Sequence, residues 1–121
     1  MRQVGVGAFM KLAYVCAPLT GDVPANIAKA REYCRQLVDL DVCPISMHLS
    51  YDGVYDDNNP KQRKTALEIC LRVIEFCDLV VVFGNRITEG MALEIDAAEQ
   101  LGIPITYTNP KLKRKCVGIG S

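Results

Sequence analysis

Apolar residues along this chain change their spacing from segment to segment, and the changes indicate alternating strands and helices. Short apolar runs have the length of strands and are bounded by Gly, Pro and Asp. Between them lie longer segments in which apolar residues repeat at helical spacing. The predicted strands are, in chain order, LAYVCA (12–17), VCPISM (42–47), DLVVVFG (78–84) and IPITYT (103–108).

Three helices are expected between these strands. The first begins near Pro24, a residue that suits a first helical turn. The second spans 61–77. The third begins after Thr88, which can cap it, continues to Leu101 and stops at Gly102. The apolar stripes of the first two helices are Ile27, Ala30, Cys34, Leu37 and Val38, followed by Ala66, Leu67, Cys70, Val73, Ile74 and Cys77.

Alternating strands and helices are typical of an α/β domain with a mainly parallel sheet and helices on both faces. We therefore expect a flavodoxin-like or Rossmann-like three-layer sandwich. The strand at 78–84 is apolar on both faces, as a central parallel strand should be. Pro44 pushes the second strand towards a sheet edge. The domain is expected to cover 11–110, with a leader at 1–10 and a tail at 111–121.

Ligands of such folds bind beyond the carboxyl ends of the strands. The segments that leave the predicted strands there are also the most polar and Gly-rich parts of the chain. The segment at 48–60 is rich in turn residues and long for a connection in a small domain, which favours a functional loop. These segments are APLTG, HLSYDGVYDD, GNRITEG and TNPK.

Charge and composition narrow the classes of partner. The chain has 121 residues, with 14 Lys and Arg against 14 Asp and Glu. No basic field points to nucleic acid, and the short KLKRK run at 111–115 is typical of a solvated end. No apolar run approaches the roughly 20 residues of a membrane span. The first ten residues lack the pattern of a secretory signal.

The chain has six cysteines and one histidine, which bear on its cellular compartment and on whether it binds a metal or redox cofactor. No pair of cysteines forms a CxxC motif, and a single histidine does not complete the usual ligand pattern of a zinc site. Most of the cysteines lie in apolar segments, where a reduced thiol behaves as a small hydrophobe. We therefore expect a cytoplasmic protein with reduced thiols and no metal or redox cofactor. The cysteines are Cys16, Cys34, Cys43, Cys70, Cys77 and Cys116.

The third helix carries an acid on its apolar face. At about 100° per residue, Glu94 lies in the middle of the stripe that Gly90, Met91, Ala98 and Leu101 form. An unpaired buried carboxylate costs several kcal/mol as an order of magnitude. Three explanations stay open: an ion pair with Arg or Lys, a tilt that brings the acid to solvent, or a cleft in which it does chemistry. Its place near a helix N-terminus predicts an ionised carboxylate, as a nucleophile requires.

Four motifs occur in a characteristic order along the chain: YVCAPLTGD, CDLVVVFG, EGMALEI and AEQLGIPI. With them the chain resembles the nucleoside 2-deoxyribosyltransferase-like superfamily, and more closely a small bacterial and phage branch of it. The resemblance covers about 11–108. It implies that Glu94 attacks the anomeric carbon of a deoxynucleoside and releases the base, with Gly90 in the preceding turn. It also implies that Tyr14 holds this glutamate, where the plainer explanation is a core aromatic, and that the protein is a homo-oligomer.

The sequence departs from the family on the side of the base. Well-studied transferases carry aspartates that handle the base and its protonation, and Cys70 and Thr88 stand in their places here. The segment after the second strand offers substitutes: His48 as an acid or hydrogen-bond donor, and Asp52, Asp56 and Asp57 as carboxylates. A structural histidine and solvated turn acids are the plainer explanations.

Further polar residues follow the other strands. Arg86 can pair with a phosphate or with Glu94, and Thr20, Gly21 and Thr88 offer donors at helix starts. No Walker or GxGxxG motif is present. The expected substrate-binding residues are Pro18, Thr20, Gly21, His48, Asp56, Arg86, Thr88 and Gly90, beside the catalytic Glu94 and Tyr14.

The sequence thus predicts a protein that binds a nucleoside or nucleotide and cleaves or transfers at its N-glycosidic bond through a glutamate nucleophile. The alternative is a non-catalytic nucleotide sensor or sequestering module on the same fold, which Cys70 and Thr88 favour. A structural assembly subunit that binds no nucleotide is a third possibility.

Overall fold

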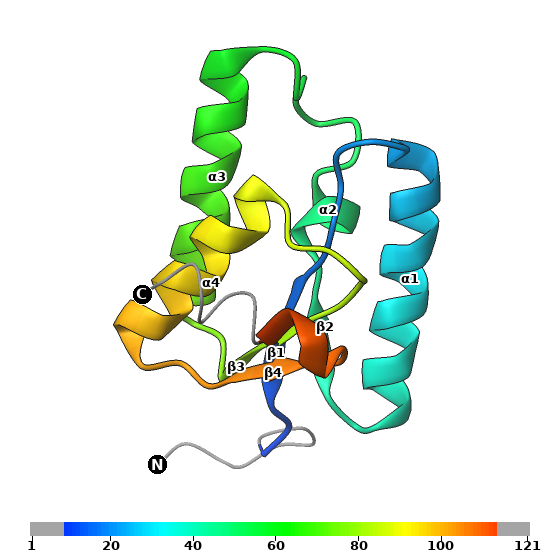
Figure 1. Cartoon of the computed structure of the whole chain (residues 1–121), viewed down its shortest axis with the longest axis vertical. Helices are drawn as coiled ribbons and strands as arrows, with labels where there is room; N and C mark the ends of the chain where they lie inside the picture. Colours follow the sequence, from blue (N-terminus) through cyan, green and yellow to red (C-terminus); the bar gives the residue numbers. More distant parts are fainter. Residues whose placement is uncertain (1–8, 114–121) are drawn as a thin grey trace, which may run out of the picture.

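Four short strands form one parallel sheet in the computed structural model, which describes residues 9–113. The strand order is β2-β1-β3-β4 (Figure 1). The predicted α/β fold with a parallel sheet between helices is confirmed. The elements are β1 (Leu12–Cys16), α1 (Val23–Asp39), β2 (Cys43–Ile45), α2 (Met47–Ser50), α3 (Pro60–Ile74), β3 (Leu79–Val82), α4 (Glu89–Leu101) and β4 (Ile105–Tyr107).

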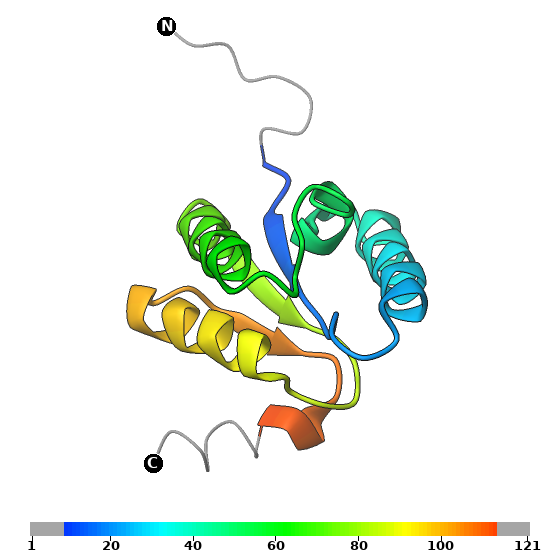
Figure 2. The ribbon, with the colours of Figure 1, turned by 90° about the horizontal axis from the view of Figure 1, so that it is seen from above.

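The helices form a layer on each face of the sheet. Figure 2 shows α3 and α4 on one side of the strands and α1 on the other. Because side chains alternate along a strand, β1 directs Tyr14 and Cys16 into the core under α3 and α4 and Val15 into the core under α1. In the same way, β3 directs Val80 into the core under α3 and α4 and Val81 into the core under α1. The sheet thus has a hydrophobic core on both faces, as the continuous apolar run of β3 predicted.

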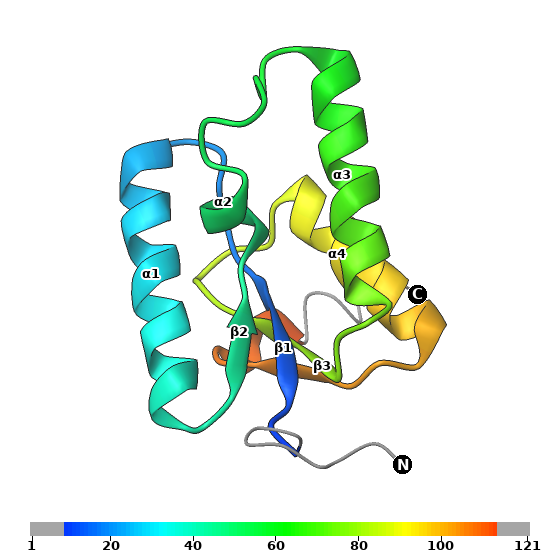
Figure 3. The ribbon, with the colours of Figure 1, turned by 180° about the vertical axis from the view of Figure 1, so that it is seen from behind.

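The second predicted strand is shorter than expected. β2 forms the sheet edge that Pro44 predicted, but it ends at Ile45. The Ser46 side chain then accepts a hydrogen bond from the Leu49 amide at 3.3 Å and begins α2. The prediction of strand up to Met47 was therefore wrong, because a serine at this point caps a helix. Figure 3 shows α2 directly beyond the end of β2, which brings His48 to the carboxyl ends of the strands.

The helices follow their predicted caps closely. α4 begins after Thr88, whose hydroxyl accepts from the Met91 amide at 3.2 Å, and ends at Gly102 with φ of +72°. A left-handed residue at this point is most readily glycine. α3 is one turn shorter at its C-terminal end than predicted, since it stops at Ile74.

Two positions assigned to apolar stripes are more exposed than helical spacing suggested. Val38 is 54% exposed, because α1 is nearly at its end there, and Leu101 is 50% exposed at the end of α4. Tyr33, outside the predicted stripe of α1, instead stacks on Phe83 with ring centroids 4.5 Å apart.

The start of the predicted tail contributes to the core. Residues 110–113 form a helical turn, and Leu112 is buried in the core under α3 and α4. Most of the predicted leader and tail lie outside the described residues, as does Cys116. None of the five cysteines within 9–113 forms a disulfide. No helix in this range is long and apolar enough to cross a membrane.

Candidate active site

Glu94 is buried in the protein and hydrogen-bonded to β1. The side chain is 6% exposed, which excludes a tilt of α4 that would bring it to solvent. Tyr14, itself 1% exposed, donates its hydroxyl proton to Glu94 Oε2. The two ion pairs of the described residues, Arg35–Asp39 and Arg72–Glu75, lie elsewhere. A tyrosine therefore satisfies this carboxyl, and the ion pair considered from the sequence is not formed.

Two thiols complete the surroundings of the carboxyl. Cys16 Sγ lies 3.5 Å from Glu94 Oε1, and it reaches this atom because it follows Tyr14 by two residues on the same face of β1. Cys70 extends from α3 and interacts with both Glu94 and Tyr14. Burial raises the pKa of the Cys70 thiol to about 11, so this thiol stays protonated and able to donate. Cys70 thus contacts the Glu94 carboxyl from α3.

The protonation of Glu94 differs from the expectation based on helix position. Burial raises its pKa to about 7, although the hydrogen bonds from Tyr14, Cys16 and Cys70 act in the opposite direction. The helix dipole acts within the first turn, and Glu94 lies beyond that turn, so desolvation dominates. A substantial fraction of the carboxyl is therefore protonated at neutral pH. Burial, followed by the charge of Glu94, also raises the pKa of Tyr14 well above 10, which keeps this hydroxyl a donor.

Removing the tyrosine hydroxyl should raise the pKa of Glu94 further. Tyr14→Phe deletes a hydrogen bond that favours the charged form, so the carboxylate becomes harder to form inside the protein. A hydrogen bond to a charged group is worth about 1.5–3 kcal/mol, which corresponds to an increase of about one to two pKa units. Carbon NMR of labelled glutamate during a pH titration measures this increase in the pKa of Glu94. Tyr33→Phe, on the other face of the sheet, should leave the titration unchanged.

A cavity of about 300 Å3 lies beside Glu94 at the carboxyl ends of the strands. Residues of the connections after β1, β2 and β3 line it, together with residues on the facing sides of α3 and α4. Its position matches the site expected for parallel α/β folds. The lining residues are Ala17, Leu19, Thr20, His48, Tyr55, Asp57, Arg63, Ala66, Leu67, Cys70, Thr88, Glu89, Gly90, Met91 and Glu94.

The structure brings only part of the expected site together. Thr20, His48, Thr88 and Gly90 line the cavity with Glu94. Apart from the neighbouring residues and backbone of α4 itself, no heavy atom lies within 4 Å of the point where a side chain on Gly90 would start, so the backbone there is open to a ligand.

Other expected residues lie outside this cavity. Asp56 accepts from the Asn58 amide within its own turn, at 2.9 Å, and its neighbour Asp57 lines the cavity instead. Pro18 and Arg86 line a second cavity, together with residues of α1. Arg86 donates to the Thr20 carbonyl at 2.7 Å, and Gly21 lies beside its guanidinium. The arginine is therefore separated from Glu94, whereas the sequence left a pairing between them open.

His48 has a defined tautomer. Its Nε2 lies 2.7 Å from the Ala17 carbonyl, which can only accept, so Nε2 carries the proton. Burial lowers the pKa of His48, while the Ala17 carbonyl and the charge of Asp57 oppose this shift. The ring is therefore neutral at pH 7. This bond connects the residue after β1 to α2 and holds two sides of the cavity together.

Four polar residues of the cavity were not among the expected substrate-binding residues, although Asp57 was considered as a substitute carboxylate. Arg63 comes from α3 and Glu89 from the first turn of α4, while Tyr55 and Asp57 come from the long connection before α3. Burial raises the pKa of Tyr55, and the nearby acidic groups of Cys70, Asp57 and Glu94 add to the increase. Only Asp57 had a sequence signal, as one of several turn acids. Arg63 and Glu89 look like ordinary exposed helix residues until the helices are placed.

Comparison with known proteins gives a family and a fold. The family model described as Domain of unknown function (DUF7768) matches residues 11–108. The chain belongs to this family. The match covers all the elements from β1 to β4 and every residue of the Glu94 cavity. No curated protein sequence matches the chain.

Two solved structures share the fold of this DUF7768 domain. One is the 2-deoxyribosyltransferase of the psychrotolerant bacterium Bacillus psychrosaccharolyticus, with a TM-score of 0.63 and 18% identity over 79% of this chain and 70% of that one. The other is a conserved protein from Enterococcus faecalis V583, with a TM-score of 0.54 and 25% identity over 81% of this chain and 62% of that one. The DUF7768 domain therefore has the fold of a 2-deoxyribosyltransferase.

Proposed function

We propose that this protein belongs to the nucleoside 2-deoxyribosyltransferase-like superfamily and cleaves or transfers at the N-glycosidic bond of a nucleoside or nucleotide, with Glu94 as the nucleophile. The observation that carries the proposal is the Tyr14–Glu94 hydrogen bond beside a cavity at the strand ends. A protein gains no evident stability from a buried carboxyl without a cation, so chemistry is the better reason for it. The fold shared with a 2-deoxyribosyltransferase supports the same conclusion.

The reaction follows the double displacement of retaining glycosidases. A carboxylate oxygen of Glu94 forms a bond to the anomeric carbon while the bond from that carbon to the base nitrogen breaks. The electron pair of the broken bond goes to the base, which takes up a proton. Water or a second base then attacks the anomeric carbon, gives its proton to the group that protonated the first base, and displaces Glu94 as a carboxylate. Tyr14 holds the carboxylate oriented and stabilises its charge, both before the attack and after its release.

The base needs a proton source, and the cavity offers acids that the family pattern does not include. Asp57 and Glu89 line the cavity, each from a different element than Cys70. Either carboxyl can form hydrogen bonds to the edge of a nucleobase and so take the part of the aspartates that handle the base in the related transferases. His48 is neutral, and its protonated nitrogen is bound to Ala17, so it suits positioning better than proton donation.

A panel of deoxynucleosides, ribonucleosides and their monophosphates tests the proposal. Incubation with the wild-type protein above pH 7, where Glu94 is ionised, should release free base from at least one member, as measured by chromatography. Base exchange with a second base would identify a transferase, and release into water a hydrolase. A full panel without free base would contradict the enzymatic proposal.

The second candidate is a module that binds nucleotides without cleaving them. It is favoured by Cys70 and Thr88, which replace the acids of the related transferases at the side of the base. Calorimetric titration with the same panel distinguishes it, since a sensor would bind a member that stays intact. The proposals of a homo-oligomer and of a cytoplasmic location accompany both candidates.

A further inference from the structure

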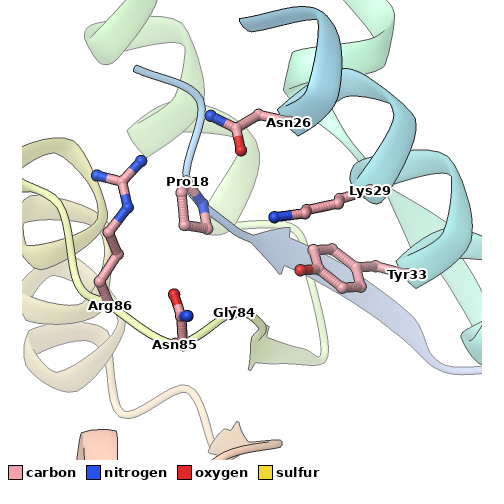
Figure 4. Close-up of a pocket in the computed structure, with 7 residues that line it drawn as sticks. All are labelled: Pro18, Asn26, Lys29, Tyr33, Gly84, Asn85 and Arg86. Atoms are coloured by element: carbon pink, nitrogen blue, oxygen red, sulfur yellow. The ribbon is translucent and has the colours of Figure 1, made fainter. Parts of the chain in front are cut away.

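A second cavity, of about 230 Å3, lies at the same end of the sheet but on the side of α1. Figure 4 shows that its walls come from α1, from the start of the β1–α1 connection and from the β3–α4 connection. None of its lining residues lines the Glu94 cavity. It is a separate site and takes no part in the proposed chemistry.

The charges that line this cavity are positive. Lys29 extends from α1 and Arg86 from the β3–α4 connection, and no Asp or Glu is among the lining residues. In Figure 4 the Lys29 ammonium and the Arg86 guanidinium stand on opposite sides of the Pro18 ring. Neither cation forms an ion pair within residues 9–113, where both ion pairs involve other arginines. The cavity of Glu94, by contrast, contains the acids Asp57, Glu89 and Glu94 beside Arg63.

Hydrogen bonds hold the positive cavity in shape. Arg86 donates from Nη2 to the Thr20 carbonyl at 2.7 Å. Asn26, which is 8% exposed, donates from Nδ2 to the carbonyls of Thr20 and Leu19, at 3.2 and 2.8 Å. Both side chains thus fasten the same loop, and the guanidinium keeps further N–H groups for a ligand. The arginine is therefore fixed in place before an anion arrives, which lowers the entropic cost of binding.

The floor of the cavity depends on a glycine. Gly84 has φ of +96°, and a Cβ there would stand 3.0 Å from Pro18 Cδ and 4.0 Å from the Tyr33 hydroxyl. A side chain at this position would fill the space between the loop and Tyr33. The Tyr33 ring is held by its stacking on Phe83, so its hydroxyl is presented at the cavity. Asn85, next in the chain, adds an amide.

We propose that this second cavity binds a phosphate group. A phosphate dianion balances the two positive charges of Lys29 and Arg86, whereas a carboxylate balances only one of them. Its oxygens can accept from both cations, from the Tyr33 hydroxyl and from the Asn85 amide. The ligand is therefore inorganic phosphate or a small phosphate ester. Because the two cavities share the loops after β1 and β3, an occupied phosphate site would also steady the Thr20 and Thr88 side of the Glu94 cavity.

Calorimetric titration with inorganic phosphate tests the site. The wild type should bind in the millimolar range or tighter, more weakly as salt is added, because the contacts are partly exposed charges. Lys29→Gln, on the exposed side of α1, should weaken binding about tenfold or more, and Lys29→Arg should restore most of it. Lys64→Gln, an exposed lysine of α3 that lines no cavity named here, should bind as the wild type does. Wild type that does not saturate, or a Lys29→Gln variant that binds normally, would overturn the proposal.

Two further measurements identify the source of the phosphate group and test whether its binding depends on Glu94. If a deoxynucleoside monophosphate binds more tightly than phosphate and depends on Lys29, the group belongs to a nucleotide. If both bind equally, the ligand is the free anion. Glu94→Gln should bind phosphate normally, so failure of the glycosidic proposal would leave this one standing. Loss of phosphate binding in Glu94→Gln would instead show that the two cavities are one site.

Discussion

Glu94→Gln is expected to abolish base release while leaving ligand binding in place. The amide keeps the shape of the carboxyl and can still accept the Tyr14 hydroxyl proton, so the cavity should be preserved. The amide cannot form the glycosyl ester, because it lacks the anionic oxygen that attacks the anomeric carbon. Base release by any substrate found in the panel should therefore fall by several orders of magnitude, whereas the dissociation constant should change little.

Chromatography of free base and calorimetry on the same preparation measure the two quantities. Glu99→Gln is the matched control, since it makes the same change on the exposed side of the same helix. It should keep full activity. A Glu94→Gln variant with the specific activity of the wild type would rule out Glu94 as the nucleophile, whatever its stability.

The same substitution should change how stability depends on pH. The folded pKa of Glu94 is about 7, above the ordinary 4.5 of a glutamate in an unfolded chain. Between these values the folded state holds a proton that the unfolded state has lost, so the free energy of unfolding falls as pH rises. The separation corresponds to about 3 kcal/mol, reached once the pH exceeds the folded pKa. Glu94→Gln carries no such charge and should be the more stable protein at pH 8, while the two should differ little near pH 4.5.

Chemical denaturation of both proteins at several pH values measures this difference. The comparison is necessary because His48, whose pKa burial lowers, makes the opposite contribution and loses stability as pH falls. That contribution is common to both proteins and cancels in the difference between them. Glu99→Gln should follow the wild type at every pH. A Glu94→Gln variant less stable than the wild type at pH 8 would mean that the carboxylate is well compensated and that its burial is structural.

Local periodicity predicted one member of the hydrogen-bonded Tyr14–Glu94 pair. Helical spacing placed Glu94 on the apolar face of α4, whereas Tyr14 was expected beside it only from the resemblance to the transferase superfamily. In the structure, side-chain alternation along β1 brings Tyr14 and Cys16 to the face of the sheet that α4 covers. The protonation of Glu94 was not predictable in the same way, because it depends on how much water the packed helices exclude.

The sequence by itself determined the alternation of strands and helices, the central β3, the edge position of β2 and the place of Glu94 on the apolar face of α4, while the structure showed that Glu94 is buried. These features follow from spacing and from backbone chemistry within a few residues, such as Pro44 at an edge and Gly102 after α4. The tertiary structure alone decided which polar residues meet. It brought Arg63 and Glu89 into one cavity with Glu94, selected Asp57 instead of Asp56, and placed Arg86 in a second cavity with Lys29. Such choices depend on the direction of loops and the distance between helices, which a sequence pattern does not encode because its periodicity is local.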